Sequence, residues 1–575
     1  MTLQKHAVAK ALADRINALL EREEYCADGL AQMLEYPPNG EMGDVALPCF
    51  KLAKAFRRPP AAIAEAICDG FSISGISKIE SVNGYLNFFI DRTYAANKII
   101  GEVLERKEKY GASNEGEGKT VVLDYSSPNV AKPFHIGHLG TTVIGHSLKK
   151  LFAFNGYNCV GINYLGDWGT QFGKLIVAYR KYGSKEMVEK DGIDALVALY
   201  VRFHKEAEAD PKLEDEARAE FTKLEHGDAE NTALWKWFID ISIAEYQKTY
   251  RQLGIDFDSW KGESFYSDKM PAVVEELKEK KLMKIDDGAS IIDLSAYNMP
   301  PCLILKRDGS SLYPTRDIAA ALYRKNHYHF DRAVYVTSAG QCLHFAQWFK
   351  VVELMGYDWA KDLIHVPYGT VSLNGEKLAT RTGNVILLRD LFDLAIEKVS
   401  AVINEKNPDL ENKEQIAEDV GVGAVVFYYL SNNRMKDINF VMDDALSFDG
   451  NTGPYVQYTY ARTCSVLSKS GCGEDDIKKF ASAKADISDD EYEVIKALSM
   501  YPERVASALA EFEPSLITRY ILDLATAYNR FYHNEKILTA ENEEQKNFRI
   551  ALTAATKYVL GSAFELICLK KTEKI

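Results

Sequence analysis

"KTVVLDYSSPNVAKPFHIGHLG" (residues 119–140) joins a β-branched run, a polar loop and the start of a helix in one short stretch. The run predicts a strand that ends near Tyr125, and the helix is expected from about Gly137. A strand that leads directly into a helix is typical of a parallel sheet, and such sheets bind ligands at their carboxyl edge. The stretch therefore predicts both the central fold and the place of its site.

Further short apolar runs continue the alternation of strand and helix. They are CVGINYLGD (159–167), ASIIDLSAY (289–297), CLILKRDGSSLYPT (302–315), RAVYVTSAG (332–340) and LIHVPYGTVSL (363–373). Together they predict an α/β fold with a doubly wound, Rossmann-like and mostly parallel sheet. The RDGSS segment between two runs is a hairpin signal, so at least one strand pair is expected to be antiparallel.

The chain of 575 residues is too long for a single core, and its pattern changes at several points. Residues 1–115 alternate helix and strand, as in a small α+β module, and end in a polar, glycine-rich linker. We expect a central domain over 116–440 that carries a charged helical insertion at about 184–262. Residues 441–575 show apolar stripes at helical spacing and are expected to form an all-α helix bundle.

Composition limits the classes of function. The sequence is 47% hydrophobic and 26% charged, and it has no apolar run long enough to cross a membrane. Its N-terminus is interrupted by charges and does not resemble a signal peptide, so we expect a cytoplasmic protein. The nine cysteines form no CxxC pair, which argues against a structural zinc site. The net charge of −14 argues against a general nucleic-acid coat but allows one nucleic-acid partner on a local basic face.

The first candidate for chemistry is the pair of histidines at the predicted start of the helix. His135 and His138 are three residues apart and can face one side of the first turn. A helix N-terminus offers free amide donors to phosphate, and imidazoles there can stabilise charge that develops on it. Gly137 would let a flat base approach the backbone, and Lys132 adds a positive charge. The four-residue pattern is weak alone, since a helix cap with solvated histidines would produce it too.

The second candidate is a polar loop that follows a late strand. SLNGEKLATRTGNVI (372–386) contains Lys377 and Arg381 between glycines and threonines. A mobile cationic loop of this kind could close over phosphates and then release them. Taken alone, the same composition is also typical of a solvated surface loop.

Together these motifs resemble the two signatures of class I aminoacyl-tRNA synthetases, HIGH at 135–138 and KLATR at 377–381. Five longer stretches narrow the resemblance to arginyl-tRNA synthetases, and the resemblance extends from the N-terminal module to the last helix. The five are SSPNVAKPFHIGHLG, NYLGDWGTQFG, LYPTRDIAAAL, GQCLHFAQ and FDGNTGPYVQYTYAR. The family departs from most class I enzymes by often lacking the second lysine of its KMSKR loop; here that position is Thr380. In the family, a lysine just before HIGH is thought to supply the charge, and Lys132 stands there.

The resemblance implies an ATP-dependent ligase that activates arginine as an adenylate, releases pyrophosphate and passes arginine to the 3′ end of tRNA(Arg). Such catalysis consists of positioning and charge stabilisation, with no covalent enzyme intermediate. ATP is expected to arrive with Mg²⁺, and no tightly bound cofactor or protein-held metal is implied. The implied catalytic residues are His135, His138, Lys132, Lys377 and Arg381, and those near ATP are His135, His138, Gly137, His344, Gln347 and Lys377.

The resemblance also implies where arginine and tRNA bind. Carboxylates match the planar donors of a guanidinium, and the residues implied for that pocket are Asp124, Asn129, Tyr313, Asp317 and Gln341. Many arginyl enzymes carry glutamate at the position of Asp124. The N-terminal module would contact the tRNA elbow through Tyr85 and Asn87. The bundle would read the anticodon, with Tyr455, Tyr458 and Arg462 as candidates, although bundle core would explain two of the three tyrosines at 455, 458 and 460 equally well.

Other classes of protein remain as alternatives. A nucleotidylyltransferase also uses an HxGH turn, but it has no need of a long helical C-terminus or an accessory N-terminal domain. A non-catalytic tRNA-binding relative should have lost HIGH, Lys132 or the acidic pocket, and all of these are present. A metal hydrolase lacks a third ligand near the histidines. We expect a monomer whose partners are tRNA(Arg), L-arginine and ATP, with no membrane partner.

Overall fold

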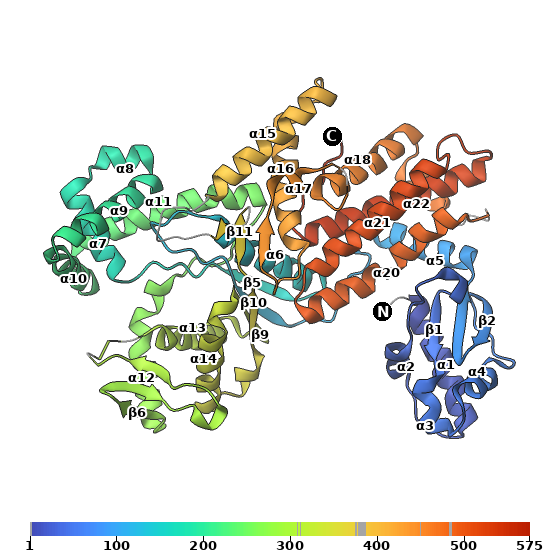
Figure 1. Cartoon of the computed structure of the whole chain (residues 1–575), viewed down its shortest axis with the longest axis horizontal. Coiled ribbons are helices and arrows are strands. Elements are labelled where there is room, and N and C mark those ends of the chain that lie inside the picture. Colours follow the sequence, from blue (N-terminus) through green and yellow to red (C-terminus); the bar gives the residue numbers. More distant parts are fainter. Residues whose placement is uncertain are drawn as a thin grey trace.

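A computed structural model of the chain describes residues 3–307, 309–310, 312–373, 376–377, 387–448, 450–481 and 486–575. Figure 1 shows a central sheet, a cluster of helices at one end, a long helix bundle at the other, and a small module below the bundle. The predicted fold class is confirmed: an α/β parallel-sheet domain stands between an N-terminal α+β module and an all-helical C-terminal region. No helix within the described ranges combines the length and apolar character that a membrane span requires.

The N-terminal module is a three-stranded antiparallel sheet covered by helices on one face. Its strand order is β1-β3-β2, and its core is separate from that of the rest of the chain. The strands are β1 (Val45–Pro48), β2 (Ile76–Val82) and β3 (Tyr85–Ile90). The helices are α1 (Leu3–Leu20), α2 (Ala27–Met33), α3 (Ala53–Phe56) and α4 (Pro60–Cys68). Helix α5 (Arg92–Arg106), capped by Asp91, then leads into the central domain.

The central domain is built on a four-stranded parallel sheet of order β10-β9-β4-β5. Its strands are β4 (Thr120–Asp124), β5 (Asn158–Ile162), β9 (Arg332–Ser338) and β10 (Leu363–Tyr368). The alternation of side chains along β4 divides the core: Val121 and Leu123 face helix α6 (Leu139–Phe154), whereas Val122 faces α13 (Tyr313–Tyr328) and α14 (Cys342–Leu354). Asp124 shares the face of Val122 and ends β4 at the carboxyl edge of the sheet.

Two of the predicted strands belong to a different sheet. The runs at 289–297 and 302–315 form β7 (Ala289–Ile292) and β8 (Cys302–Leu305). Strand β7 pairs antiparallel with β8 on one side and with β6 (Met283–Asp286) on the other. Near the RDGSS stretch, of which residues 308 and 311 lie outside the described ranges, the Lys306 N–H donates to Ser310 O over 2.9 Å, and the chain continues into helix α13 and not into a strand. Short β-branched runs identify strands without identifying their partners, so the sequence could not separate the two sheets.

Helices dominate the expected insertion, and the cluster begins earlier than expected. Within 184–262 the helices are α8 (Lys185–Asp191), α9 (Ile193–Ala209), α10 (Lys212–Glu225) and α11 (Ala229–Leu253). Helix α7 (Thr170–Tyr182) packs closely on α10, so it belongs to the same cluster. Helix α12 (Met270–Glu279) follows the cluster and leads to β6.

Strand β13 (Ile438–Phe440) joins β11 (Val371–Leu373) and β12 (Glu376–Lys377) in a small sheet, and the regular elements described after residue 440 are all helices. The helices of the C-terminal region pack on one another and on α6. They are α15 (Leu388–Lys406), α16 (Lys413–Leu430), α17 (Met442–Leu446), α18 (Gly453–Ser470), α19 (Glu474–Lys479), α20 (Asp489–Glu511), α21 (Ser515–Asn534) and α22 (Glu543–Leu566).

Candidate active site

A cavity of about 580 Å³ opens at the carboxyl ends of β4 and β9. It lies where the strand–loop–helix stretch predicts a site, and its walls come from the loop after β4, the start of α6 and helices α13 and α14. Seven residues predicted from the sequence line it: Asp124, Asn129, His138, Tyr313, Asp317, Gln341 and His344. The fold therefore brings side chains from distant parts of the sequence, from Asp124 to His344, into one cavity.

The histidine turn is a short 3-10 segment, Ile136–His138, that runs into α6. The two imidazole centroids are 4.0 Å apart. The backbone N–H of His135 donates to His138 Nδ1 over 3.2 Å, and the N–H of Gly137 donates to His135 Nδ1 over 3.1 Å. Since each Nδ1 accepts, a neutral ring carries its proton on Nε2 and can donate it to a ligand. A Cβ on Gly137 would lie 2.8 Å from His135 Cε1, so a larger residue here would require the His135 ring to move.

Burial keeps both imidazoles neutral. Burial, then the charge of His135, lowers the pKa of His138 to about 3. Burial and the nearby Lys132 also lower the pKa of His135. A neutral imidazole donates a hydrogen bond to a phosphate without carrying a full charge, so the pair suits charge that shifts during a reaction.

Hydrogen bonds from the helical cluster α7–α11 hold the loop between β4 and the histidines in place. The Tyr246 hydroxyl on α11 donates to Asn129 O over 2.7 Å and to Lys132 O over 2.8 Å. A Cβ on Gly166 would lie 2.0 Å from Asn129 Oδ1, so the glycine leaves room for that side chain. The cluster thus acts as a support for the loop that carries Asn129 and Lys132.

The cavity also has an acidic lining. Asp124 Oδ2 lies 2.7 Å from Arg324 Nη1, and its Oδ1 accepts a hydrogen bond from Ser127 Oγ over 3.0 Å. Asp317 Oδ2 lies 2.7 Å from His344 Nε2. A third carboxyl, Glu263, also lines the cavity; burial raises its pKa to about 7, against the effect of the paired Arg316. Such a lining can bind a planar cation.

Sequence reasoning missed several cavity residues. Arg324, Glu263, Tyr164 and Tyr335 line the cavity beside the predicted residues. Arg324 could have been found, because Tyr313, Asp317, Ala320 and Arg324 follow the i, i+4, i+7, i+11 spacing of one helix face. Tyr164 and Tyr335 carry no such signal, because they come from the loop after β5 and from the neighbouring strand β9.

Other predicted residues lie outside the cavity walls. Lys132 is exposed on the loop, and His135 and Gly137 belong to the adjoining turn. The Gln347 amide donates to Pro300 O over 2.9 Å and to Pro301 O over 3.1 Å, away from the other predicted residues. Lys377 ends β12, which pairs with β11, and Arg381 lies outside the described residues. In the described part of the chain, no three His, Cys, Asp or Glu side chains cluster as a metal site would require.

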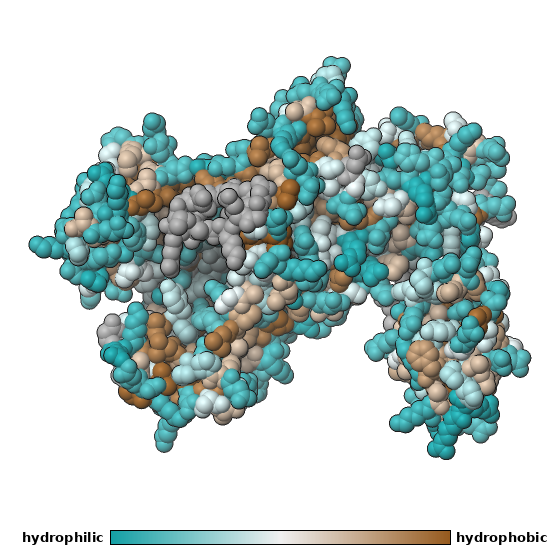
Figure 2. Space-filling view, viewed as in Figure 1, coloured by the Kyte–Doolittle hydropathy of each residue, from teal (hydrophilic) through white to brown (hydrophobic). Residues whose placement is uncertain are grey.

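The residues predicted for nucleic acid lie on the two flanking domains. On β3, Tyr85 is 37% exposed, its ring centroid is 5.9 Å from that of the exposed Phe50, and Asn87 on the same face of the strand is buried. Phe50 was not predicted, because it precedes the strand in a short helical turn. The face in Figure 2 is largely hydrophilic over this module and over the bundle.

On the bundle, Arg462 lies between two exposed rings. Its Cζ is 5.0 Å from the Tyr458 centroid and 4.6 Å from that of Tyr532, and its guanidinium donates to Asn529. Tyr455 is half-buried against the core and Tyr460 is buried, whereas Tyr458 is 44% exposed. Tyr532, on α21, completes the arrangement and was missed because it is distant in sequence.

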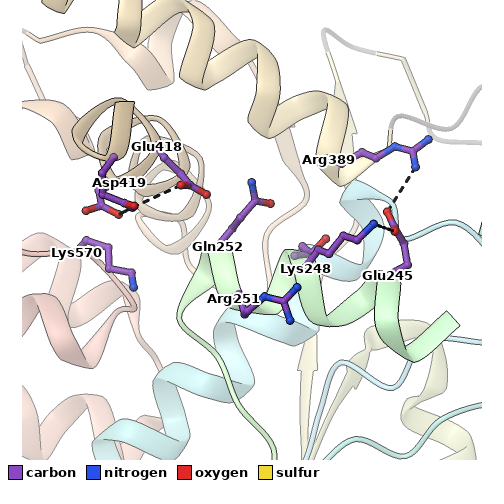
Figure 3. A pocket seen from close by; sticks show the side chains of 10 residues that line it. Glu245, Lys248, Arg251, Gln252, Arg389, Glu418, Asp419 and Lys570 are labelled. Atoms are coloured by element: carbon purple, nitrogen blue, oxygen red, sulfur yellow. Dashed lines mark hydrogen bonds and ion pairs between the residues drawn. The ribbon is translucent and has the colours of Figure 1, made fainter. Parts of the chain in front are cut away.

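A second cavity, of about 630 Å³, lies between the end of α11 and helices α15 and α16. Figure 3 shows charged side chains of both signs around it, among them Arg251, Arg389, Glu418, Asp419 and Lys570. None of the residues predicted from the sequence lines this cavity, and no pair of imidazoles faces it. The cavity at the carboxyl edge of the sheet is therefore the candidate active site.

Comparisons with known proteins agree over the whole chain. Three family models match: an arginyl tRNA synthetase N-terminal domain at 4–90, a class I (R) tRNA synthetase catalytic domain at 99–442, and a DALR anticodon binding domain at 456–575. The arginine–tRNA ligase of Alkaliphilus metalliredigens is 52% identical over 572 residues, covering 99% of each chain. That of Clostridioides difficile is 50% identical over 572 residues, with the same coverage.

Solved structures share the fold. The arginyl-tRNA synthetase of Thermus thermophilus superposes with a TM-score of 0.83 at 24% identity, covering 100% of both chains. A methionyl-tRNA synthetase of Mycobacterium tuberculosis gives a TM-score of 0.51 at 11% identity, covering 78% of this chain and 91% of that one. With three domain models in order and relatives of about half identity along the full length, the chain belongs to the arginyl-tRNA synthetase family of class I aminoacyl-tRNA synthetases.

Proposed function

We propose that the chain activates L-arginine with ATP to arginyl-adenylate, releasing pyrophosphate, and then transfers arginine to the 3′ end of tRNA(Arg). One observation carries the proposal: a single cavity is lined both by the imidazole of His138, whose Nε2 is available to donate, and by the carboxylates of Asp124 and Asp317. A polyphosphate fits the imidazole and a guanidinium fits the carboxylates, as this reaction requires.

In the activation step the arginine carboxylate attacks the α-phosphate of ATP. His135 and His138 would donate hydrogen bonds to the phosphates, and Gly137 would leave space for the adenosine. Lys132 supplies positive charge from the exposed loop, and Lys377 and Arg381 would supply it from the later signature. His344 and Gln347 remain candidates near ATP. Mg²⁺ would enter with ATP and neutralise its phosphates, so the protein needs no metal cage of its own.

In the arginine pocket, Asp317 and Asp124 would accept from the guanidinium, with Asn129, Tyr313 and Gln341 completing the contacts. Asp317 is the better placed of the two acids, because its side chain is more exposed to the cavity than that of Asp124. The His344 contact at Asp317 would have to be replaced or shared when the guanidinium binds.

In the transfer step the tRNA would lie along the flanking domains. Tyr85 and Phe50 offer a ring surface for the elbow, with the buried Asn87 on the same strand as Tyr85, and Tyr455, Tyr458 and Arg462 are the candidates for contact with the anticodon. Bases stack on exposed rings, and arginine pairs with phosphate.

The test is ATP–pyrophosphate exchange with each amino acid, with and without tRNA(Arg), followed by aminoacylation of that tRNA. Exchange with arginine alone supports the proposal, and a requirement for tRNA would add an ordered mechanism. His138→Ala should lower the exchange rate on the order of 10²-fold. His226→Ala, at an exposed histidine that ends α10, is the matched control and should leave it unchanged. A folded chain that binds tRNA but exchanges with no amino acid would instead be a non-catalytic relative.

A further inference from the structure

Arg324 is a buried cation at the back of the candidate active site. It lies on α13, seven residues after Asp317 on the same helix face, and is 1% exposed. Burying a charge is costly unless a partner compensates it, so a wholly buried arginine inside a pocket for arginine needs an explanation.

The surroundings of Arg324 fix its guanidinium in one place. Its Nη1 lies 2.7 Å from Asp124 Oδ2. Its Cζ lies 5.1 Å from the ring centroid of Tyr164, 5.7 Å from that of Tyr335 and 5.9 Å from that of Tyr266. Three aromatic faces and one carboxylate therefore enclose it, an arrangement that favours a cation.

Asp124 is held on both of its oxygens. Arg324 holds Oδ2, and the Ser127 hydroxyl donates to Oδ1 while accepting from the Tyr164 N–H over 3.1 Å. The carboxylate is thus oriented before any substrate arrives. Asp124 is also one methylene shorter than the glutamate that many arginyl enzymes carry at this position. A short side chain needs such a fixed anchor if it is to present a constant edge to the pocket.

The charges of the cavity also depend on Arg324. Each of its three carboxyls has a cationic or titratable partner: Asp124 with Arg324, Glu263 with Arg316, and Asp317 with His344. Two of these partners are guanidinium groups that keep their charge at all relevant pH values, whereas the third is an imidazole. When Glu263 is ionised, its pair with Arg316 and the pair of Asp124 with Arg324 each balance, and Asp317 carries the remaining negative charge, which matches a substrate whose side chain carries one positive charge.

We propose that Arg324 is a positioning residue for the selection of arginine: it anchors Asp124 as an ionised, oriented carboxylate and sets the charge of the pocket for a single guanidinium. This inference rests on the proposed function, since it assigns a role within the same pocket. Arg324 acts through Asp124 and takes no part in the chemical step.

Titration offers a way to separate this role from simple packing. Burial raises the pKa of Asp124, and Arg324 opposes that effect. The other charged or titratable groups that face Asp124 are Asp317 and His344, Glu263 beside Arg316, and the hydroxyls of Tyr164, Tyr266 and Tyr335. Without Arg324, Asp124 should take up a proton at a higher pH, and only its ionised form can accept two donors from arginine.

The experiment measures the KM for arginine and for ATP between pH 6 and 9 by pyrophosphate exchange with tRNA(Arg) present. Arg324→Met keeps an apolar side chain in the aromatic cage. It should raise the KM for arginine on the order of 10-fold to 100-fold at low pH, with recovery as the pH rises and with little change in the KM for ATP. Arg324→Lys retains the charge and should restore part of the affinity.

The double variant Asp124→Asn/Arg324→Met removes both charges together. Its KM for arginine should be raised but should follow the pH dependence of the wild type, because Asp124 no longer titrates and the other titratable groups of the cavity, such as Glu263, are unchanged. Three results would overturn the inference: an unchanged KM for arginine in Arg324→Met, an increase that is equal at every pH, or a parallel rise for ATP accompanied by lost thermal stability. The wild-type chain is measured first, so that a lack of arginine-dependent exchange there counts against the proposed function itself.

Discussion

His146 shows how one buried side chain links stability to pH. It lies in α6, where its Nδ1 is 3.1 Å from the Tyr125 hydroxyl, and burial, followed by the charges of Lys150 and Lys149, lowers its pKa to about 3. The unfolded chain binds a proton on this ring below about pH 6.5, whereas the folded chain does so only near pH 3. Acid therefore favours unfolding across that window, and the contribution is fully recovered above it.

We expect His146→Gln to reduce the acid sensitivity of the chain. In the wild type the free energy of unfolding should fall by up to about 1.4 kcal/mol per pH unit for this residue below pH 6.5. The glutamine variant should lose that part of the slope between pH 6.5 and pH 5, as measured by urea unfolding at each pH. His226→Gln, at an exposed position, should keep the wild-type slope. An identical slope in all three proteins would contradict the argument.

Asp317 is the acid that we expect to bind arginine most directly. Asp317→Asn removes the charge but keeps the shape, so the KM for arginine should rise on the order of 10²-fold while the KM for ATP and the melting temperature change little. Asp268→Asn is the matched control, because that carboxylate is exposed and pairs only with its neighbour Lys269 among the contacts described. Kinetics of pyrophosphate exchange provide the measurement, and an unchanged KM for arginine would remove Asp317 from the pocket.

At the scale of elements, helix α6 depends on close approach to the strand before it. A Cβ on Gly145 would lie 2.2 Å from Tyr125 Cβ, at the end of β4. Since that contact involves the root of a buried side chain, the helix itself would have to move. Its first turn continues into the histidine turn, so the displacement should reach the candidate active site.

Gly145→Ala should therefore cost about 1–3 kcal/mol of stability and lower the exchange rate as well. Gly101→Ala, in α5, provides the control, since a Cβ there meets no atom within 4 Å. That change should be neutral or stabilise by up to about 1 kcal/mol, because alanine favours the helix. Chemical denaturation of the two variants gives the comparison. Equal effects would mean that helix propensity, and not the contact with Tyr125, decides the outcome.

Many of the helices and strands, and part of the candidate active site, could be predicted from the sequence. The strand–loop–helix stretch gave β4 and α6 because local pattern decides such units. Pairing between strands could not be predicted, and so β7 and β8 were assigned to the parallel sheet. In the cavity, Asp124 and Asp317 were predicted, and helical spacing from Asp317 could have added Arg324, but its ion pair with Asp124 depends on the packing of α13 on the sheet. Contacts across distant elements, such as Tyr458 with Tyr532, depend on packing that no local pattern records.

At the scale of the whole molecule, the N-terminal module is attached by polar contacts. The described contacts to α20 include Lys5 and Tyr36 with Glu503, and Asp44 with Lys496. Such surface pairs contribute little stability, and the module has its own core. We therefore expect the remainder to stay folded when the module is removed.

We expect a chain that begins at Asp91, the cap of α5, to fold and to melt within a few degrees of the full chain, as recorded by calorimetry. The KM for arginine should be retained, whereas the KM for tRNA in aminoacylation should rise on the order of 10-fold, because the Phe50–Tyr85 surface is lost. Single changes of Phe50 and Tyr85 to alanine in the full chain should reproduce part of that rise. A truncated chain with an unchanged KM for tRNA would show that the module does not contact it.

Helix α6 is also in close contact with helices of the bundle. The Ser147 hydroxyl donates to Leu566 O over 2.6 Å at the end of α22, and a Cβ on Gly140 would lie 2.2 Å from the Tyr429 hydroxyl of α16. The helix has 16 residues and spans about 24 Å. The contacts at Gly140 and Ser147 thus hold the first half of this helix against the bundle. We expect a shift of α16 against α22 to displace the start of α6 and with it the imidazoles, so that the domain that would read the anticodon is in mechanical contact with the groups that would hold ATP.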